Sequence, residues 1–311
     1  MDKPLISYVV TTYNIEKFVE ESVKCAFAQT YSPLEIVLSD DCSTDRTYDI
    51  MRQLAEEYTG PHRIVLNRNE ENLGITRHMN KVFLEIASGE IIVVAHGDDL
   101  SDATRTEEMM DFLIANPSIT QVACGAVVVN ENGVPYDSYT QRNFHVDELK
   151  TYSFGSGAHV SIGFSAFRKS VMEYFGPLDE KCPTEDDPIG FRAIILGQIA
   201  FMPNVHITYR KHSGSNSNPE LFVKFPLDEI YNQNLRDMEK AKNDGKLSEE
   251  VVRTEKERLY KSKEIRKLYR RYFAERKVKH LVTLLKCPYL TNRRRVSYIR
   301  EHFEYLRGHH E

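Results

Sequence analysis

The sequence lacks the features that anchor a chain in a membrane or cross-link a small secreted fold. No apolar run approaches the roughly 18 residues that a bilayer-spanning helix needs. The first residues, MDKPLISYVV, lead straight into a strand-like run and leave no room for a signal peptide. The five cysteines are scattered and form no C-x-x-C pair, which argues against a zinc site or a disulfide framework. We therefore expect a cytoplasmic protein with reduced cysteines.

Charge is distributed unevenly along the 311 residues. Residues 251–311 hold 18 Lys and Arg against 7 Asp and Glu, whereas the remainder holds 23 against 39. A basic tail on an acidic body predicts an anionic partner, such as lipid headgroups on the inner face of a membrane. A homodimer interface or a solvated helical appendage explains the same composition. The tail carries no zinc, RNP or G-x-x-G signature, so we do not expect it to bind nucleic acid.

The first half of the chain alternates short apolar runs with amphipathic stretches, which is typical of an α/β fold with a Rossmann-like, doubly wound, mostly parallel sheet. After Asn130 the pattern becomes irregular and partly antiparallel, with one helix near Asp187–Leu196, and we expect this section to pack on the first sheet. From about Phe225 the chain is helical, so we predict domains at residues 1–220 and 221–311. The expected strands are Leu5–Thr11, Glu35–Leu38, Arg63–Leu66, Ile91–Ala95 and Gln121–Val129, and the expected helices are Ile15–Gln29, Asp45–Tyr58, Ile75–Ala87, Thr104–Ala115, Leu247–Phe273 and Asn292–Arg307.

Two adjacent carboxylates, Asp98 and Asp99, follow the buried-strand pattern Ile91–Ala95. In open α/β sheets, ligands bind beyond the carboxyl ends of the strands. Adjacent carboxylates repel each other unless a cation or ligand hydroxyls neutralise them, and a hard divalent metal with a nucleotide diphosphate would do so. A plain loop or helix cap is the competing interpretation.

Polar residues also follow the first two predicted strands. The segment V-V-T-T-Y-N places Thr11 and Tyr13 where a nucleoside can be held, and L-S-D-D-C-S-T-D places Asp41 where an acid can accept the N–H of a base. Turn and cap chemistry explains the same residues, and Asn14 with Ser43 or Thr44 stand where helix caps belong.

Two basic residues stand in segments suited to anion binding. In N-L-G-I-T-R-H-M-N, Gly74 precedes a helix whose backbone N–H groups could face an anion, and Arg77 lies one turn further on. In Y-R-K-H-S-G-S-N-S, His212 could contact phosphates or ligate a metal. A surface arginine and a polar loop are the alternatives.

Three consecutive acids occur in P-T-E-D-D-P-I-G-F-R, directly before Pro188. Proline suits the first turn of a helix, so Asp186 and Asp187 lie near its start. A carboxylate here could act as a general base that takes a proton from a hydroxyl group. An acidic cap that the helix dipole stabilises is an equally good interpretation.

Together these segments resemble the inverting family 2 glycosyltransferases of the GT-A fold, from about Pro4 to Ser217. The resemblance implies transfer of a sugar from a nucleotide diphosphate donor, most simply a UDP-sugar, to a hydroxyl of a carbohydrate or lipid-linked acceptor in surface polysaccharide or glycan assembly, with Mg²⁺ or Mn²⁺ as cofactor. It assigns the catalytic base to Asp186, the metal to Asp99 and His212, and the donor to Thr11, Tyr13, Asp41, Arg77 and Asp98.

The chain departs from the family pattern in two places. Many members carry an acid where this chain has His96 or Gly97, and Asp187 duplicates the candidate base. A sugar nucleotidyltransferase would share the sheet, but the first strand lacks the Gly-rich loop with Arg and Lys that such an enzyme needs. A non-catalytic nucleotide-sugar-binding protein is the other alternative, and the acids at Asp99 and Asp186 argue against it.

Overall fold

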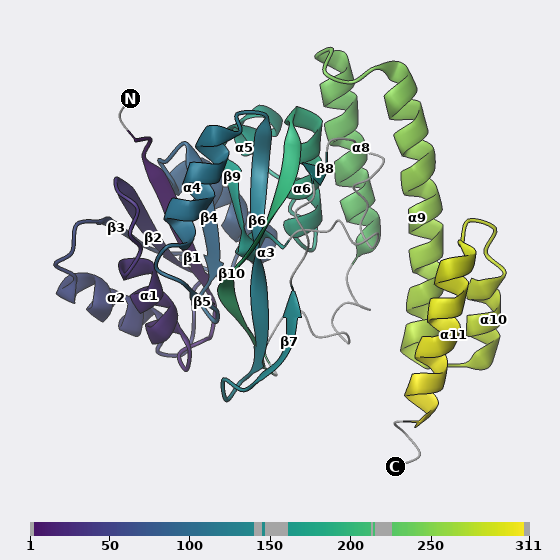
Figure 1. The fold of residues 1–311 in the computed structure, drawn as a ribbon, viewed down its shortest axis with the longest axis horizontal. Helices are drawn as coiled ribbons and strands as arrows, with labels where there is room; N and C mark the ends of the chain where they lie inside the picture. The colour runs from purple at the N-terminus through teal and green to yellow at the C-terminus, as the bar shows by residue number, and fades with distance from the viewer. Residues whose placement is uncertain (1–2, 140–144, 147–160, 213, 215–225, 308–311) are drawn as a thin grey trace.

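The computed structural model describes residues 3–139, 145–146, 161–212, 214 and 226–307. They form an α/β body built on one sheet, from which a set of long helices extends to one side (Figure 1). The predicted fold class, a mostly parallel sheet followed by a helical C-terminal extension, is confirmed.

Ten strands form the sheet, in the order β3-β2-β1-β4-β9-β6-β10-β5, with β7 paired to β6 and β8 paired to β10. The first four strands in this order are parallel, and β9 runs antiparallel to both β4 and β6. The carboxyl ends of β1, β2 and β4 therefore meet at one edge. The strands are β1 (Ile6–Thr12), β2 (Leu34–Asp40), β3 (Arg63–Arg68), β4 (Ile91–His96), β5 (Leu100–Ser101), β6 (Ile119–Asn130), β7 (Pro135–Tyr139), β8 (His145–Val146), β9 (Ser165–Arg168) and β10 (Gln198–Lys211).

Helices cover both faces of the sheet, as the pattern predicts. Along β1, Tyr8 and Val10 enter one core cluster while Val9 enters the other, because successive strand residues point to opposite faces. The first face is covered by α1 (Val19–Phe27), α2 (Thr47–Glu57) and α4 (Arg105–Ala115). The second face is covered by α3 (Ile75–Lys81), its π-helical continuation η1 (Val82–Ile86), α5 (Ser170–Phe175) and α6 (Asp186–Leu196). The short 3₁₀ turn η2 (Ile162–Phe164) contributes residues to both core clusters.

The C-terminal helices divide between two cores. Helix α8 (Leu227–Asn243) and the first half of α9 (Glu249–Glu275) join the cluster that contains α6, whereas the second half of α9 packs with α10 (Val278–Leu285) and α11 (Asn292–Arg307) in a smaller cluster. None of the helices in the described part of the chain is long and apolar enough to cross a membrane.

The caps predicted at Asn14, Ser43 and Thr44 are wrong, because these residues join two loops instead. The backbone N–H of Asn14 donates to Ser43 Oγ at 2.9 Å, and that of Thr44 donates to Asn14 Oδ1 at 2.8 Å. Helices α1 and α2 begin later, at Val19 and Thr47. The loops after β1 and β2 are thus fixed to each other at the edge where the site residues gather.

Candidate functional site

The ends of β1 and β4 are held together at the carboxyl edge of the sheet. Thr11 lies opposite His96, with 3.4 Å between Thr11 Oγ1 and His96 Nδ1, and Gly97 N–H donates to Thr11 O at 3.0 Å. Tyr13, two residues beyond Thr11, is 45% exposed. Of the two residues predicted to hold a nucleoside, Tyr13 therefore offers its ring to solvent while Thr11 is buried.

Asp41 is buried after β2 and organises the loop that follows β3. Its Oδ1 accepts hydrogen bonds from Leu73 N–H at 2.9 Å and Asn69 Nδ2 at 2.8 Å, and its Oδ2 accepts from Gly74 N–H at 2.9 Å. Gly74 has a φ of 73°, which places its N–H over this carboxylate before α3 begins. The anion that faces the start of α3 is thus the Asp41 side chain.

Arg77 lies one turn into α3 and pairs with surface acids. Its Nη2 is 3.3 Å from Glu71 Oε1 and its Nε is 3.8 Å from Glu180 Oε2. Its side chain is 41% exposed, so these ion pairs are weak and exchangeable. Arg77 faces the loop before α6, and no hydrogen bond among the described residues links it to Asp41 or Asp99.

The turn after β4 brings Asp98 to His212, although 114 residues separate them. The distance between Asp98 Oδ2 and His212 Nε2 is 3.0 Å, and the His212 side chain is 9% exposed. Long strand β10 carries His212 to this edge because it runs parallel to β6 over most of its length. The structure therefore brings together Asp98, Asp99 and His212, as the sequence predicts.

Asp99 is buried beside this pair with only part of its hydrogen-bonding capacity used. Its Oδ1 accepts from Arg210 N–H at 2.9 Å, whereas its Oδ2 is buried without a hydrogen-bond partner in the described part of the structure. Burial and the neighbouring Asp98 charge raise the pKa of the Asp99 carboxyl well above its ordinary value. An incompletely bonded buried carboxylate calls for a further ligand.

Phe18 and Arg210 support His212, and the sequence reasoning missed both. The Phe18 ring lies 4.8 Å from the His212 ring, and the Arg210 guanidinium lies 4.6 Å from the Phe18 ring centroid. Arg210 Nη2 also pairs with Glu21 Oε2 at 2.8 Å, which ties the strand to α1. One signal was available, because Arg210 lies near the end of β10 and His212, two residues later, directly follows that strand, so an extended chain would place both on one face.

Asp186 begins α6 and bonds to η2, which packs on the end of β4. Its Oδ1 accepts from Ile162 N–H at 2.6 Å. The next residue, Gly163, packs so closely on His96 that an added Cβ would lie 2.5 Å from His96 Cδ2. A continuous set of contacts thus connects the candidate base to the end of β4. Asp187, the alternative base, is buried, whereas Asp186 is partly exposed.

Glu185 precedes Asp186 and is itself a buried carboxyl, 4% exposed. Burial, with the Asp186 charge added, raises its pKa to about 8. Near neutral pH Glu185 therefore carries its proton, and the start of α6 does not concentrate all three of the negative charges that the sequence implies.

Among the described residues, no group of three or more His, Cys, Asp or Glu side chains has the geometry to hold a metal ion by itself. The residues that fit a divalent cation best are Asp99, through its unpartnered Oδ2, and the Asp98–His212 pair beside it. Oxygen ligands with one imidazole suit Mn²⁺ and, less well, Mg²⁺, both of which take further oxygens from substrate phosphates.

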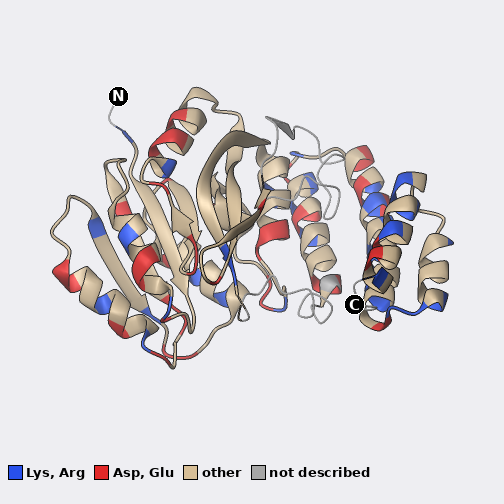
Figure 2. Cartoon of the chain, turned by 60° about the horizontal axis from the view of Figure 1, so that its bottom comes forward, with Lys and Arg blue, Asp and Glu red and all other residues tan. Residues whose placement is uncertain are grey.

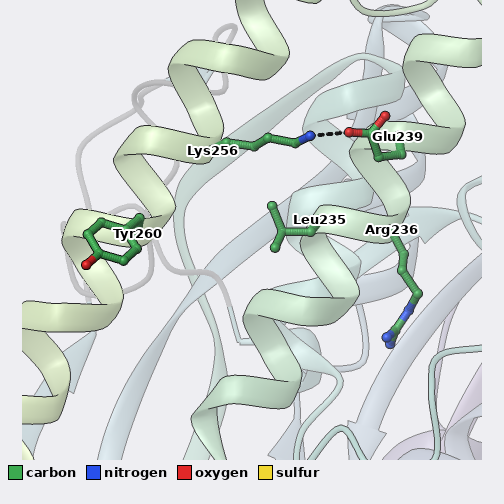
Figure 3. A pocket seen from close by; sticks show the side chains of 5 residues that line it. All are labelled: Leu235, Arg236, Glu239, Lys256 and Tyr260. Carbon is green, nitrogen blue, oxygen red and sulfur yellow. Dashed lines mark hydrogen bonds and ion pairs between the residues drawn. The ribbon is translucent and has the colours of Figure 1, made fainter.

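A cavity of about 620 Å³ lies elsewhere, between α8 and α9 (Figure 3). An ion pair between Lys256 and Glu239 crosses it. None of its lining residues comes from the strand ends or from α6, so it does not belong to the site described above. The lining residues are Leu235, Arg236, Glu239, Lys256 and Tyr260.

Comparison with known proteins agrees with this geometry. Residues 7–176 match the family described as glycosyl transferase family 2. A putative teichuronic acid biosynthesis glycosyltransferase, TuaG of Bacillus subtilis, is 30% identical over 150 residues, which are 48% of this chain and 56% of that protein. The chain spans about half the length of the curated relatives it matches.

Two solved structures share the fold. Staphylococcus aureus TarS 1–349 in complex with UDP superposes with a TM-score of 0.57 at 19% identity, covering 75% of this chain and 64% of that chain. The mannosyltransferase PcManGT from Pyrobaculum calidifontis, in complex with GDP-Man and Mn²⁺, gives 0.54 at 19% identity, covering 82% and 70%. At this identity the likeness establishes the fold alone, and it confirms the GT-A type predicted from the motifs.

Proposed function

The chain belongs to glycosyl transferase family 2, and from this premise we propose that it transfers a sugar from a nucleotide diphosphate donor to an acceptor hydroxyl. One observation carries the proposal. Asp186, η2 and His96 form a continuous set of contacts that links the Asp186 carboxylate to the end of β4, and the Asp98–Asp99 turn follows that strand. A base and a diphosphate site at one sheet edge are what such a transfer requires.

The donor nucleoside lies, on this proposal, over the ends of β1 and β2. Tyr13 offers an exposed ring there, Thr11 lines the strand end, and Arg77 is free to exchange its surface ion pairs for the base or the diphosphate. A carboxylate has about four lone-pair positions, and Asp41 uses three of them. The fourth can accept the N–H of a uracil. The UDP bound by TarS supports a uridine donor, whereas PcManGT binds GDP-Man. The identity of the donor nucleobase should therefore be measured first.

We place a divalent metal, Mn²⁺ or Mg²⁺, at Asp99 Oδ2 with help from Asp98 and His212. A bound metal would supply charge neutralisation for the donor diphosphate and its leaving group. Phe18 and Arg210 keep the His212 ring in place, and Arg210 N–H fixes the orientation of the Asp99 carboxylate. The Mn²⁺ in PcManGT is consistent with this assignment.

Asp186 takes the proton of the acceptor hydroxyl as that oxygen attacks the anomeric carbon of the donor. A new C–O bond forms on the face opposite the diphosphate, the bond to the diphosphate breaks, and the configuration inverts. Ile162 N–H holds Asp186 Oδ1, so we assign the proton to Oδ2. Asp187 is a poorer choice because it is buried.

The acceptor is a carbohydrate or a lipid-linked glycan in surface polysaccharide assembly. TuaG, whose printed name places it in teichuronic acid biosynthesis, supports this setting. The basic C-terminal helices support a proposal that the protein acts at the cytoplasmic face of a membrane, and a dimer remains the alternative use of those helices.

Donor binding and transfer should be measured separately. We expect Asp186→Asn to lower turnover by roughly 10²–10⁴-fold, because it removes the general base. Calorimetry with UDP, GDP and CDP, each with and without Mn²⁺, should show that the same variant still binds one nucleotide as the wild type does. Asp179→Asn, in the loop before α6, is the matched control for charge removal. Full turnover in Asp186→Asn would exclude this base, and nucleotide binding by a wild type that transfers no sugar would indicate a non-catalytic binding protein.

A further inference from the structure

Helix α11 has one face fixed to α9. The Tyr298 ring stacks on Tyr269 with 4.9 Å between centroids, Tyr272 Oη lies 3.0 Å from His302 Nδ1, and Arg276 Nη1 pairs with Glu301 at 2.7 Å. Tyr298, Glu301 and His302 are spaced three and four residues apart and therefore share a face. These contacts determine which side of α11 is turned outward.

The outward side carries four large apolar residues. Val296 is 66% exposed, Ile299 38%, Phe303 57% and Leu306 38%. Their spacing of three, four and three residues places them on one stripe, which is about 15 Å long at 1.5 Å per residue. Single exposed apolar residues are ordinary, but a contiguous stripe on one helix marks an interaction surface.

Arginines accompany this stripe. Arg293, Arg300 and Arg307 recur every seven residues, so they form a row along the helix beside the apolar residues. Arg300, with its side chain 80% exposed, pairs with Glu304. Residues 278–307 contain seven Lys and Arg against two Asp and Glu. Figure 2 marks the Lys and Arg positions along the C-terminal helices in blue, and the Asp and Glu positions, many of them in the α/β body, in red.

We propose that the outward side of α11, defined as Val296, Ile299, Phe303 and Leu306 with the arginine row, docks on an anionic phospholipid surface. An exposed apolar stripe with basic residues along its border is the pattern of helices that lie in the membrane interface. A second copy of the chain fits less well. A two-fold contact through the stripe would bring two arginine rows together, and like charges repel.

Vesicle flotation of the full chain tests this inference. Phosphatidylcholine vesicles with phosphatidylglycerol should bind the protein, and those without it should bind weakly. Val296→Ser with Phe303→Ser should lower the partition coefficient roughly tenfold for each side chain removed. Arg293→Gln with Arg307→Gln should lower it roughly fivefold for each charge, and added salt should reduce binding by the wild type.

Matched controls lie on the body of the protein. Ile114→Ser with Val134→Ser removes residues that are 52% and 56% exposed, and Arg52→Gln removes an exposed charge on α2. These variants should bind vesicles as the wild type does, and circular dichroism checks that all variants fold. Equal flotation of the α11 and control variants would overturn the inference. So would a concentration-dependent dimer that Phe303→Ser disrupts in a protein that binds no vesicles.

Discussion

Asp41 and Asp99 lie at the same edge of the sheet and are almost equally buried, at 3% and 4% exposure. Asp41 accepts three hydrogen bonds from the loop after β3, whereas Asp99 accepts one and leaves Oδ2 without a partner in the described residues. Asp41 thus serves the fold whether or not a donor is bound, whereas Asp99 keeps one carboxyl oxygen without a partner among the described residues. The comparison teaches that incomplete hydrogen bonding, more than burial, is what makes Asp99 the candidate for a metal ligand.

Glu185, another buried carboxyl, gives the largest expected effect on the free energy of unfolding. Its pKa is about 8 in the folded protein against an ordinary 4.5, so the folded state binds the proton more tightly than the unfolded state does. Stability should therefore fall as the pH rises from about 4.5 to about 8, by on the order of 4 kcal/mol. Glu185→Gln should abolish this loss in unfolding experiments at several pH values. Parallel stability profiles for the wild type, Glu185→Gln and the exposed control Glu56→Gln would contradict the assignment.

Asp41→Asn tests the well-bonded side. The amide nitrogen that replaces one carboxylate oxygen cannot accept a hydrogen bond, and the charge that strengthens the others disappears. We expect a loss of about 2 kcal/mol in urea unfolding, within the range for bonds to charged groups. Asp49→Asn, on the exposed surface of α2, should change stability by less than about 0.5 kcal/mol. Equal effects of the two substitutions would remove the structural role given to Asp41.

Gly163→Ala tests the contact of η2 with His96, which connects Asp186 to the end of β4. The new Cβ would meet His96 Cδ2 at 2.5 Å, and such overpacking costs about 1–3 kcal/mol. Since η2 would have to move away from β4, turnover should fall along with stability. In a His96→Ala background the same substitution should cost much less, because the ring is gone. An unchanged cost in that background would show that His96 is not the obstacle.

Asp99→Asn should have the smallest effect on stability. An asparagine can keep the bond from Arg210 N–H while removing a buried charge, so we expect a change within about 1 kcal/mol, of either sign. Mn²⁺-dependent nucleotide binding should nevertheless disappear in calorimetry. If Asp99→Asn destabilises the protein as much as Asp41→Asn does, the distinction between the two aspartates fails.

Local sequence patterns predicted the parallel half of the fold because each strand and helix there carries its own periodicity. Strands β1 to β4 begin and end within two residues of the predicted ranges. Strand β10 was missed as one long element. Its sequence contains Pro203 and a polar end, and its pairing with β6 shifts register near Val205. Pairing with β6 stabilises this strand, and no local sequence pattern indicates that pairing.

The candidate site was likewise predictable from the sequence only in part. Strand-end acids such as Asp98 and Asp99 are visible in the sequence because an apolar run precedes them. The roles of Phe18 and Gly163 are not visible, because each depends on one contact with a residue far away in the chain, Arg210 or His96. The resemblance to a family assigned roles to positions, but the structure was needed to show which donors already occupy the Asp41 carboxylate.

Helix α6, which begins at Asp186, also contains Arg192, and Arg192 is fully buried. Its guanidinium forms two bonds to Asp237 on α8, at 2.8 and 3.2 Å, and donates to Gly176 O at 2.7 Å. An arginine deprived of a buried carboxylate partner costs several kcal/mol. Recombination between relatives with a crossover near residue 220 would separate these two residues. A C-terminal tail from a relative would therefore fit this α/β body only if it also supplied a carboxylate at the position of Asp237.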